Sequence, residues 1–281
     1  MFPMEASRLS VSARRRAGDD AAWIAVVVLT HSRVHLLRKC VEVVLGRASP
    51  ATREIVIWNN GSTDGTRAYL DALDDPRLIV VDHDRNIGQN AYARAFALTS
   101  APYLVELDDD VVSAPPNWDA TLLDAFRRLP GMGYLAADIE DDPHDPAAHH
   151  RYRVYEYETA VEDGLHLLLG PTGGACAMTS REVYERVGGF KERKNQIFFL
   201  EDEAYVRDVE KAGFRVAVLS ELRVLHNGGP YYDANEPKEK GEYWRRRTRM
   251  IARKEAIKRV LFRLPFFRRL NARFDWCIPP S

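Results

Sequence analysis

Four short apolar runs follow one another in the first part of the chain, and a segment with helical character separates each run from the next. Short runs rich in valine, isoleucine and leucine are typical of buried strands. Strands that alternate with helices in this way form a mostly parallel sheet with helices on both faces. The pattern therefore predicts an α/β fold. The expected strands are residues 23–29, 54–58, 77–81 and 103–107, and the expected helices are residues 34–46, 64–73 and 89–99.

Polar residues cluster directly after three of these runs. The clusters are Thr30–Arg33, Asn59–Asp64 and Asp108–Asp110. In open α/β sheets, ligands bind outside the carboxyl ends of the strands, so these clusters are candidate binding residues. Asp64 has a second interpretation as the N-cap of helix 64–73.

The second half of the chain is less regular. A polar loop is expected at residues 138–150 and a glycine-rich loop at residues 170–175. Residues 151–169 contain strand-like stretches that are typical of a hairpin. Further helices are expected at 117–129, 180–187 and 201–212, and further strands near 133–137 and 214–219.

Composition indicates a globular protein of a reducing compartment. The chain has 281 residues, and its three cysteines, Cys40, Cys176 and Cys277, have no paired spacing typical of a disulfide framework or a zinc site. No apolar run approaches the ~18 residues of a membrane span. Residues 1–20 lack the apolar core of a signal peptide and are expected to form a flexible tail. We expect a cytoplasmic protein, with peripheral contact at the inner membrane face as an option.

The stretch "LVELDDDVV" places Asp108, Asp109 and Asp110 at the end of an expected buried strand that also carries Glu106. Side chains alternate across an extended chain, so Asp108 and Asp110 are expected on one side and Asp109 on the other. Two hard oxygen ligands suit Mg²⁺ or Mn²⁺, and a dication would relieve their mutual repulsion. The alternative is a solvated acidic turn.

Six stretches in a fixed order resemble the motifs of the inverting nucleotide-sugar glycosyltransferases of family 2, which have the GT-A fold. The stretches are "LTHSR", "NNGSTDGT", "NIGQNAYAR", "LDDDV", "PTGGACAMTSREVYERVGGF" and "FFLEDEAYVRDVEKAGFRV". The resemblance covers roughly residues 23–228 and implies a GT-A type, mostly parallel sheet flanked by helices, in a domain of residues 21–228. It implies a Rossmann-like nucleotide-binding half over residues 21–112 and an acceptor half over residues 113–228.

The resemblance implies a divalent ion, Mn²⁺ or Mg²⁺, at the aspartates. Asp110 matches the main metal ligand of the family, and Asp108 matches a residue near the metal and the ribose. His226 stands where many relatives have a histidine that completes the coordination, although a lone histidine is more often a surface or core residue. A dication would neutralise the negative charge on the departing nucleoside diphosphate.

The resemblance also implies a set of donor contacts. Asn59 stands where the family usually has an acidic residue that accepts a base N–H, so the identity of the base stays open. Taken alone, "NNGSTDGT" is typical of a turn, and Arg94 is typical of a solvated surface. Glycines let a backbone approach a ligand closely. The implied contacts are Thr30, His31, Arg33, Asn59, Asn60, Asn86, Gly88, Arg94, Asp108, Asp109, Gly173 and Gly174.

Acidic residues at the start of helix 201–212 are candidates for the catalytic base. The resemblance implies that Asp202 is the general base and that Glu201 beside it contacts the acceptor. An inverting transfer needs one carboxylate that takes the proton of the attacking hydroxyl. The alternative is structural, because acidic side chains at a helix N-terminus are stabilised by the macrodipole.

From Tyr243 onward the chain is basic, and arginines and lysines interleave with Trp, Leu and Phe through an expected helix that ends at Pro265. Residues 229–281 are expected to form a basic helical extension. For residues 243–276, packing on the catalytic domain and contact with an anionic membrane are both open, and nucleic acid is the least favoured partner. The Gln-x-x-Arg-Trp motif of the family's processive synthases is absent, which favours transfer of one sugar per encounter.

These features together predict an enzyme. It would be an inverting, metal-dependent glycosyltransferase that moves one sugar from a nucleoside-diphosphate sugar, with UDP-sugars as the leading class. The acceptor would be a hydroxyl of a glycan, a lipid-linked glycan or a natural product. The alternative is a non-catalytic nucleotide- or glycan-binding module with the same fold. A dinucleotide-dependent oxidoreductase is disfavoured, because no G-x-G-x-x-G follows the first strand.

Overall fold

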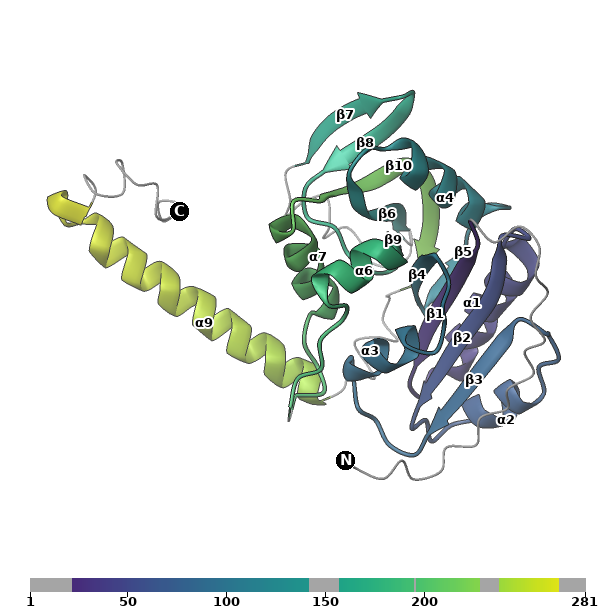
Figure 1. Cartoon of the computed structure of the whole chain (residues 1–281). Coiled ribbons are helices and arrows are strands. Elements are labelled where there is room, and N and C mark those ends of the chain that lie inside the picture. The colour runs from purple at the N-terminus through teal and green to yellow at the C-terminus, as the bar shows by residue number, and fades with distance from the viewer. Residues whose placement is uncertain (1–21, 142–156, 195, 228–237, 268–281) are drawn as a thin grey trace. The chain divides into compact units, whose positions relative to one another are not determined.

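The computed structural model of the chain describes residues 22–141, 157–194, 196–227 and 238–267 (Figure 1). The chain divides into two compact units, Met1–Ala234 and Asn235–Ser281, and each is described by itself. The expected flexible tail at residues 1–20 and Cys277 lie outside the described residues, as do residues 142–150 of the expected polar loop.

One twisted sheet organises the first unit. Among the described residues it has ten strands in the order β3-β2-β1-β4-β9-β6-β10-β8-β7, and β5 pairs with β10 off this path. The strands are β1 (Ile24–Thr30), β2 (Thr52–Asn60), β3 (Leu78–His83), β4 (Tyr103–Asp108), β5 (Val111–Ser113), β6 (Met132–Asp141), β7 (Glu158–Glu162), β8 (Leu165–Leu169), β9 (Cys176–Ser180) and β10 (Arg215–His226).

The four strands β3, β2, β1 and β4 are parallel neighbours, as the apolar runs predict. In their register Thr30 lies opposite Asn59, and Leu29 lies opposite Asp108. Because parallel strands end at the same edge, the three polar clusters of the sequence meet there. The expected α/β fold with a largely parallel sheet is confirmed.

Strand β9 was not expected from the sequence. The pattern predicts a glycine-rich loop at 170–175 and then a helix from about residue 180, but Cys176–Ser180 forms a strand between β4 and β6 and is antiparallel to both. Its five residues, "CAMTS", are short and small, and Ser180 directly caps the helix α6 by accepting the Val183 N–H at 3.2 Å. Periodicity over so short a segment gives no strand signal.

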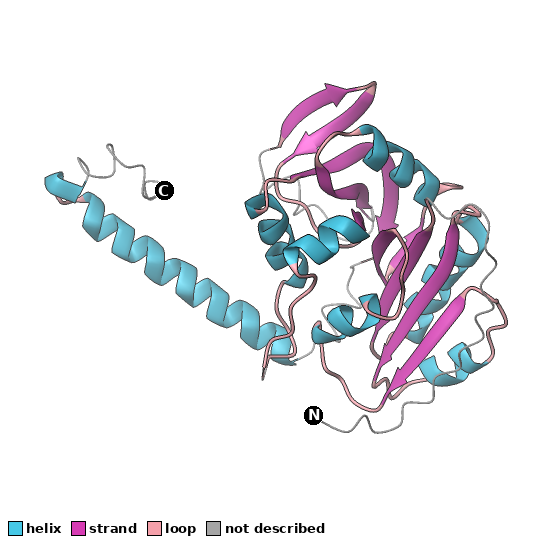
Figure 2. Cartoon of the chain, viewed as in Figure 1, coloured by secondary structure: helices cyan, strands magenta, loops and turns pink. Residues whose placement is uncertain are grey.

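Helices cover both faces of the sheet (Figure 2). On one face, α1, α2 and α4 pack against Val26 and Val105. On the other face, α3, α6 and α7 pack against Val27 and Leu104. Glu106 of β4 has the same strand parity as Leu104, so its side chain belongs to this second face. The helices are α1 (Val34–Arg47), α2 (Thr66–Asp71), α3 (Asn90–Phe96), α4 (Trp118–Arg128), α6 (Arg181–Val187) and α7 (Glu201–Lys211).

The expectation that Asp64 is the N-cap of the second helix is wrong. Gly65 occupies the N-cap of α2. Asp64 instead accepts two backbone hydrogen bonds, from Thr66 N–H at 3.0 Å and from Val34 N–H at 2.9 Å. Val34 is the first residue of α1, so one carboxylate joins the starts of two helices.

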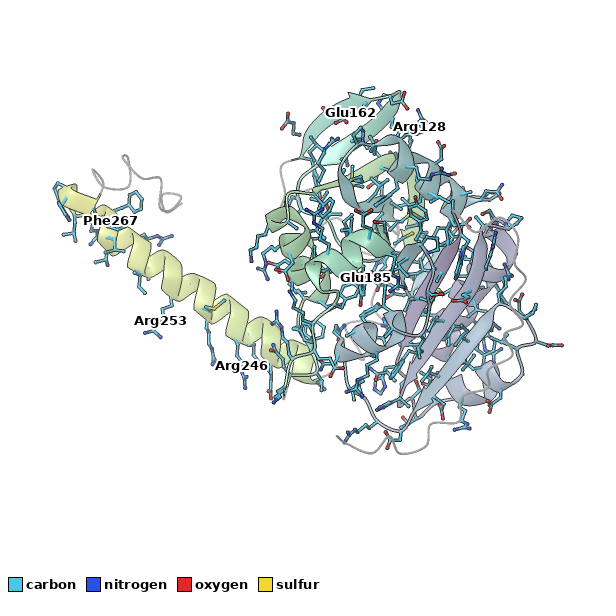
Figure 3. All side chains as sticks on the ribbon, in the orientation of Figure 1. Arg128, Glu162, Glu185, Arg246, Arg253 and Phe267 are labelled. Atoms are coloured by element: carbon cyan, nitrogen blue, oxygen red, sulfur yellow. The ribbon has the colours of Figure 1, made fainter. Side chains whose placement is uncertain are left out.

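The expected hairpin is present as β7 and β8. Arg128 at the end of α4 donates to Asp163 in its turn at 2.6 Å, and Arg215 pairs with Glu162 (Figure 3). These two ion pairs link the hairpin to α4 and to the start of β10.

The second unit contains the helix α9 (Lys238–Phe262), which overlaps the helix expected from Tyr243 to Pro265. Met250, Ile257 and Val260 are 51%, 50% and 60% exposed. Arg246 and Arg253 project from one side of the helix (Figure 3), and helical spacing puts that side close to Met250 and Ile257. Among the described helices, α9 included, none has the length and apolar composition needed to span a bilayer.

A buried carboxylate holds α4 against the turn between α1 and β2. Asp119 is fully buried and accepts three hydrogen bonds of 2.7 Å, from the Ser49 N–H, the Ser49 hydroxyl and the Thr52 hydroxyl. Asp119→Ala leaves these donors without an acceptor, so we expect the free energy of unfolding to fall by at least ~2 kcal/mol.

Urea unfolding measures this loss. Asp124→Ala on the same helix is the matched control, because Asp124 is 66% exposed and pairs with Arg128 at the surface. That pair should contribute less than ~0.5 kcal/mol. Equal midpoints for the two variants would contradict the prediction.

Candidate active site

The three aspartates lie where β4 ends and a short turn leads into β5. Asp108 and Asp110 face the same space, and His226 joins them so that one ligand atom of each lies within 4.8 Å of the others. His226 Nε2 is 2.9 Å from Asp110 Oδ1 and 3.3 Å from Asp108 Oδ2. Two carboxylates and an imidazole suit a divalent cation such as Mn²⁺. These three residues, here called the triad, could therefore hold a metal ion.

Strand pairing brings His226 to the aspartates. β5 begins directly after Asp110, and its antiparallel register with β10 places His226 opposite Val111. The Asn227 N–H also donates to the Asp110 carbonyl oxygen at 2.8 Å. The distance between His226 and Asp110 is therefore fixed by backbone hydrogen bonds.

Electrostatics within the triad favour the charged forms. Burial by itself lowers the pKa of His226, but the carboxylates of Asp110 and Asp108 more than offset this and raise it to about 10. Burial by itself raises the pKa of Asp110, but His226 and Arg33 offset it and lower the pKa to about 2. A cation in place of the imidazole proton would satisfy the same carboxylates.

Arg33 neutralises the other side of the aspartate turn. Its guanidinium lies 2.8 Å from Asp109 Oδ1 and 3.0 Å from Asp110 Oδ2. Asp109 is outside the triad, which agrees with the alternation expected along the strand. Burial raises the pKa of Asp109 to about 7, although Arg33 and the hydroxyl of buried Thr30 oppose the shift. The implied donor contacts of Arg33, Thr30 and Asp109 stay predictions.

Asn59 is engaged with the neighbouring strand. Its side-chain N–H donates to Asp82 Oδ1 at 2.6 Å, and its oxygen accepts the Ser62 N–H at 3.2 Å. Arg67 pairs with the other oxygen of Asp82. Next to these residues, the Trp58 and His83 rings stack with centroids 5.5 Å apart. Asp82, near the end of β3, thus places a carboxylate beside Asn59.

Asn60, Asn86 and His31 have structural contacts. Asn60 is buried and donates to Asn86 Oδ1 at 3.0 Å and to the Gly88 carbonyl at 3.2 Å, and it accepts the Ile87 N–H at 3.0 Å. Asn86 also accepts the Gly88 N–H at 2.7 Å. His31 Nδ1 lies 2.9 Å from the Asn60 carbonyl oxygen. These residues shape the turn before α3, and any contact with a donor stays a prediction.

Gly88 permits a close approach between this turn and the segment before α7. Its φ is +61°, and a Cβ there would lie 1.5 Å from the Ile197 carbonyl oxygen. The Gln89 N–H donates to that same oxygen at 3.0 Å, and Asn90 donates to the Gln196 carbonyl at 2.9 Å. The turn before α3 therefore positions the segment that leads into Glu201 and Asp202.

Asp202 lies at the start of α7 beside the glycine-rich loop. Its carboxylate accepts the Gly174 N–H at 3.1 Å and the Glu203 N–H at 2.7 Å. Burial raises the pKa of Asp202, and the Asp108 carboxylate adds to the shift. Burial also raises the pKa of Glu201 well above its usual value, with Asp202 adding to it. Both residues are partly exposed.

Glu106 is a site residue to which sequence reasoning gave no role. It is buried, accepts the Tyr134 hydroxyl at 2.9 Å, and lies so close to Gly174 that a Cβ there would be 2.7 Å from its carboxyl carbon. Burial raises the pKa of Glu106 well above its usual value, and Glu201 and Asp202 add to the shift. The sequence did contain a sign of this role, because Glu106 is a charged residue inside the apolar run 103–107. Gly174 thus contacts the site, and Gly173 beside it is partly exposed.

Two side chains of α3, Tyr92 and Arg94, have carboxylate partners. Tyr92 of α3, which was not expected, is buried and donates from its hydroxyl to Asp108 Oδ1 at 3.3 Å. Arg94, an implied donor contact, forms two hydrogen bonds with Glu192, of 2.8 Å and 3.1 Å, and is 45% exposed. Its guanidinium is occupied by that carboxylate, and its role toward a donor stays a prediction.

Comparison with known sequences gives relatives among glycosyltransferases. The chain is 26% identical over 242 residues to the N-acetylglucosaminyl-diphospho-decaprenol L-rhamnosyltransferase of Mycobacterium tuberculosis, covering 73% of this chain and 76% of the relative. It is 23% identical over 254 residues to the Sinorhizobium fredii protein y4gI, covering 84% of this chain. The chain spans only 28% of the length of that second protein.

Solved structures share the fold. The mannosyltransferase PcManGT from Pyrobaculum calidifontis, solved with GDP-Man and Mn²⁺, gives a TM-score of 0.56 at 19% identity, covering 77% of this chain and 61% of that one. GalNAc-T7, solved with UDP, GalNAc and Mn²⁺, gives a TM-score of 0.57 at 17% identity, covering 74% of this chain and 44% of that one.

The sequence profile described as Glycosyl transferase family 2 matches residues 25–188, which is more than half of the 281 residues. This segment includes Glu106, the aspartate turn and the glycine-rich loop, and α7 lies outside it. The chain therefore belongs to glycosyl transferase family 2, and it is a glycosyltransferase with the GT-A fold.

Proposed function

We propose that this glycosyltransferase is metal-dependent and inverting, and that it moves one sugar from a nucleoside-diphosphate sugar to an acceptor hydroxyl. The observation that carries the proposal is the position of the triad at the end of β4, with Asp202 close enough for the Asp108 carboxylate to raise its pKa. Two structural neighbours solved with Mn²⁺ and a nucleotide or nucleotide sugar support it. A UDP-sugar is the donor class that we propose.

Asp108, Asp110 and His226 are the residues that would hold Mn²⁺ or Mg²⁺. When bound, the dication supplies positive charge against the diphosphate leaving group. His226 would bind the ion through a neutral Nε2, so metal binding would compete with protonation of this imidazole. Arg33 forms ion pairs with Asp109 and with Oδ2 of Asp110, and these pairs hold both carboxylates in position.

Asp202 would act as the general base. Its two backbone hydrogen bonds fix the carboxylate, and burial raises its pKa, which makes it a stronger proton acceptor. One carboxylate that takes the acceptor proton gives a single displacement from the face opposite the leaving diphosphate, so the anomeric centre inverts. Glu201 and Gly174 would border the acceptor and the donor sugar.

For the donor base and for the acceptor we propose chemical classes. On the nucleotide side, Asn59 and Asp82 together offer amide and carboxylate groups to a base, and Trp58 and His83 lie beside them. On the acceptor side, the name of the mycobacterial relative supports a lipid-linked glycan as one class, next to other glycans and natural products.

The metal assignment predicts a loss of metal-dependent nucleotide binding. Asp110→Asn removes one ligand charge with little change of shape, so Mn²⁺ should no longer strengthen UDP binding, with a loss of at least about tenfold in affinity. Isothermal titration with UDP, with and without Mn²⁺, measures it. Asp71→Asn, at a side chain 65% exposed on α2, is the control. If Asp110→Asn binds UDP and Mn²⁺ as the parent does, the triad is not the metal site.

The base assignment predicts a loss of turnover without a loss of nucleotide affinity. Asp202→Asn keeps the size of the side chain but removes the proton acceptor, so kcat should fall roughly 10²–10⁴-fold. Release of the nucleotide from a donor that the parent turns over measures kcat, and exposed Glu210→Gln in α7 is the control.

Two results would defeat this mechanism. Near-parental turnover of Asp202→Asn would move the base role to Glu201 or Glu203. A product that keeps the anomeric configuration of the donor, read by NMR, would remove the single displacement altogether. A parent that binds UDP with Mn²⁺ but turns over no donor would favour a binding module.

The basic extension predicts association with anionic membranes. Exposed Met250, Ile257 and Val260 alternate with arginines on α9, and Leu264 and Phe266 are 52% and 74% exposed. Apolar side chains interleaved with cations favour the surface of anionic lipid. Deleting residues 262–281 should weaken sedimentation with anionic liposomes and leave sedimentation with zwitterionic liposomes unchanged. Equal sedimentation of both chains with anionic liposomes would exclude the interaction.

A further inference from the structure

A cavity of about 440 Å³ lies along the exposed side of α7, between this helix and the segment that follows α6. Its volume falls in the usual range of small-ligand sites. The rings of Phe190, Phe199 and Tyr205 form part of its wall, and all three are buried. The cavity is distinct from the triad, because none of Asp108, Asp110 and His226 lines it.

Four basic side chains line this cavity: Lys191, Arg193, Arg207 and Lys211. Lys191 and Lys211 share a single carboxylate, that of Asp208. Arg207 is paired with Glu203 at 3.3 Å. The cavity therefore has fewer acidic than basic groups, and its electrostatic field favours an anion.

Arg193 is held against an aromatic ring. Its guanidinium carbon lies 4.5 Å from the centre of the Phe199 ring, while its backbone N–H donates to Asn90 at 2.6 Å. Among the residues that the structure describes, Arg193 has no ion pair within 4 Å, although its charge opposes the raised pKa of Glu201, which lines the same cavity. An arginine positioned by an aromatic ring, with its N–H groups available, suits bidentate binding of a phosphate.

Glu201 connects this cavity to the proposed base. It lines the cavity, and it precedes Asp202 at the start of α7. Glu201, Ala204, Asp208 and Lys211 follow helical spacing along one side of α7, so the cavity runs about 15 Å from Glu201, the neighbour of the proposed base, to the end of the helix. A ligand that reaches the base with a hydroxyl can therefore extend an anionic group toward Arg193.

We propose that this basic cavity is the acceptor subsite for a phosphate group, so that the acceptor is a phosphorylated sugar or a sugar joined to its aglycone through phosphate. The proposal rests on the proposed function, since Asp202 as base defines where the acceptor hydroxyl lies. It names the acceptor class by charge: a hydroxyl-bearing sugar at Glu201 and Asp202, with its phosphate on Arg193.

The first test compares a charged ligand with its neutral counterpart. In EDTA, which silences metal-dependent binding at the triad, glucose 1-phosphate and methyl glucoside are titrated into the full chain by calorimetry. The sugar phosphate should bind at least about tenfold more tightly. Arg193→Gln and the double variant Arg193→Gln/Lys211→Gln should remove this advantage, and exposed Arg127→Gln on α4 should keep it.

A second ligand separates an acceptor subsite from a site for free phosphate. Inorganic pyrophosphate should compete with glucose 1-phosphate, and the variants at Arg193 should weaken both. Pyrophosphate binding without any advantage of the sugar phosphate over methyl glucoside would overturn the acceptor assignment. Equal binding of the sugar phosphate by the parent and by Arg193→Gln would overturn the cavity as the site.

Two variants separate a test of the phosphate subsite from a test of the catalytic base. Asp202→Asn should lose turnover and still bind glucose 1-phosphate with the parental affinity. Conversely, Arg193→Gln should bind UDP with Mn²⁺ as the parent does. Loss of UDP binding in Arg193→Gln would place Arg193 on the donor side and overturn the proposal.

Discussion

The burial of two adjacent carboxylates at the end of β4 is the constraint on which the rest of the site depends. Asp109 and Asp110 are each 1% exposed, and a buried charge without a partner costs several kcal/mol. Arg33, just before α1, and His226, at the end of β10, supply the compensating charges. These partners come from opposite ends of the domain, so the electrostatics of the turn and the closure of the sheet depend on each other.

The base side of the site is built on close backbone approach. Gly88 lets the turn before α3 contact the Ile197 carbonyl, and Gly174 lets the glycine-rich loop lie against Glu106. A Cβ at Gly88 would collide with the Ile197 backbone, and a Cβ at Gly174 would collide with the Glu106 carboxyl group. Because Gly174 also donates its N–H to Asp202, the same contacts that hold α7 in place orient the carboxylate we propose as the base.

Charge divides the site into two chemically different parts. Carboxylates gather at the strand ends and at the start of α7, where a cation and an acceptor hydroxyl would be handled. Lysines and arginines gather on the other side of α7, around Arg193. Glu201 stands at the boundary, where burial and Asp202 raise its pKa. A substrate that carries a hydroxyl and a phosphate matches this division, and a neutral acceptor uses only half of it.

The sequence by itself determined the parallel strands β1 to β4, the helices between them and the clustering of polar residues at one edge, because apolar periodicity and strand alternation are local properties. The resemblance to family motifs added Asp202 and His226. Only the tertiary structure decided that β9 intervenes between β4 and β6, that Arg33 sits on the aspartates, and that Glu106 lies under Gly174. These depend on contacts between residues far apart in the chain, and such contacts leave no periodic pattern in the sequence around them.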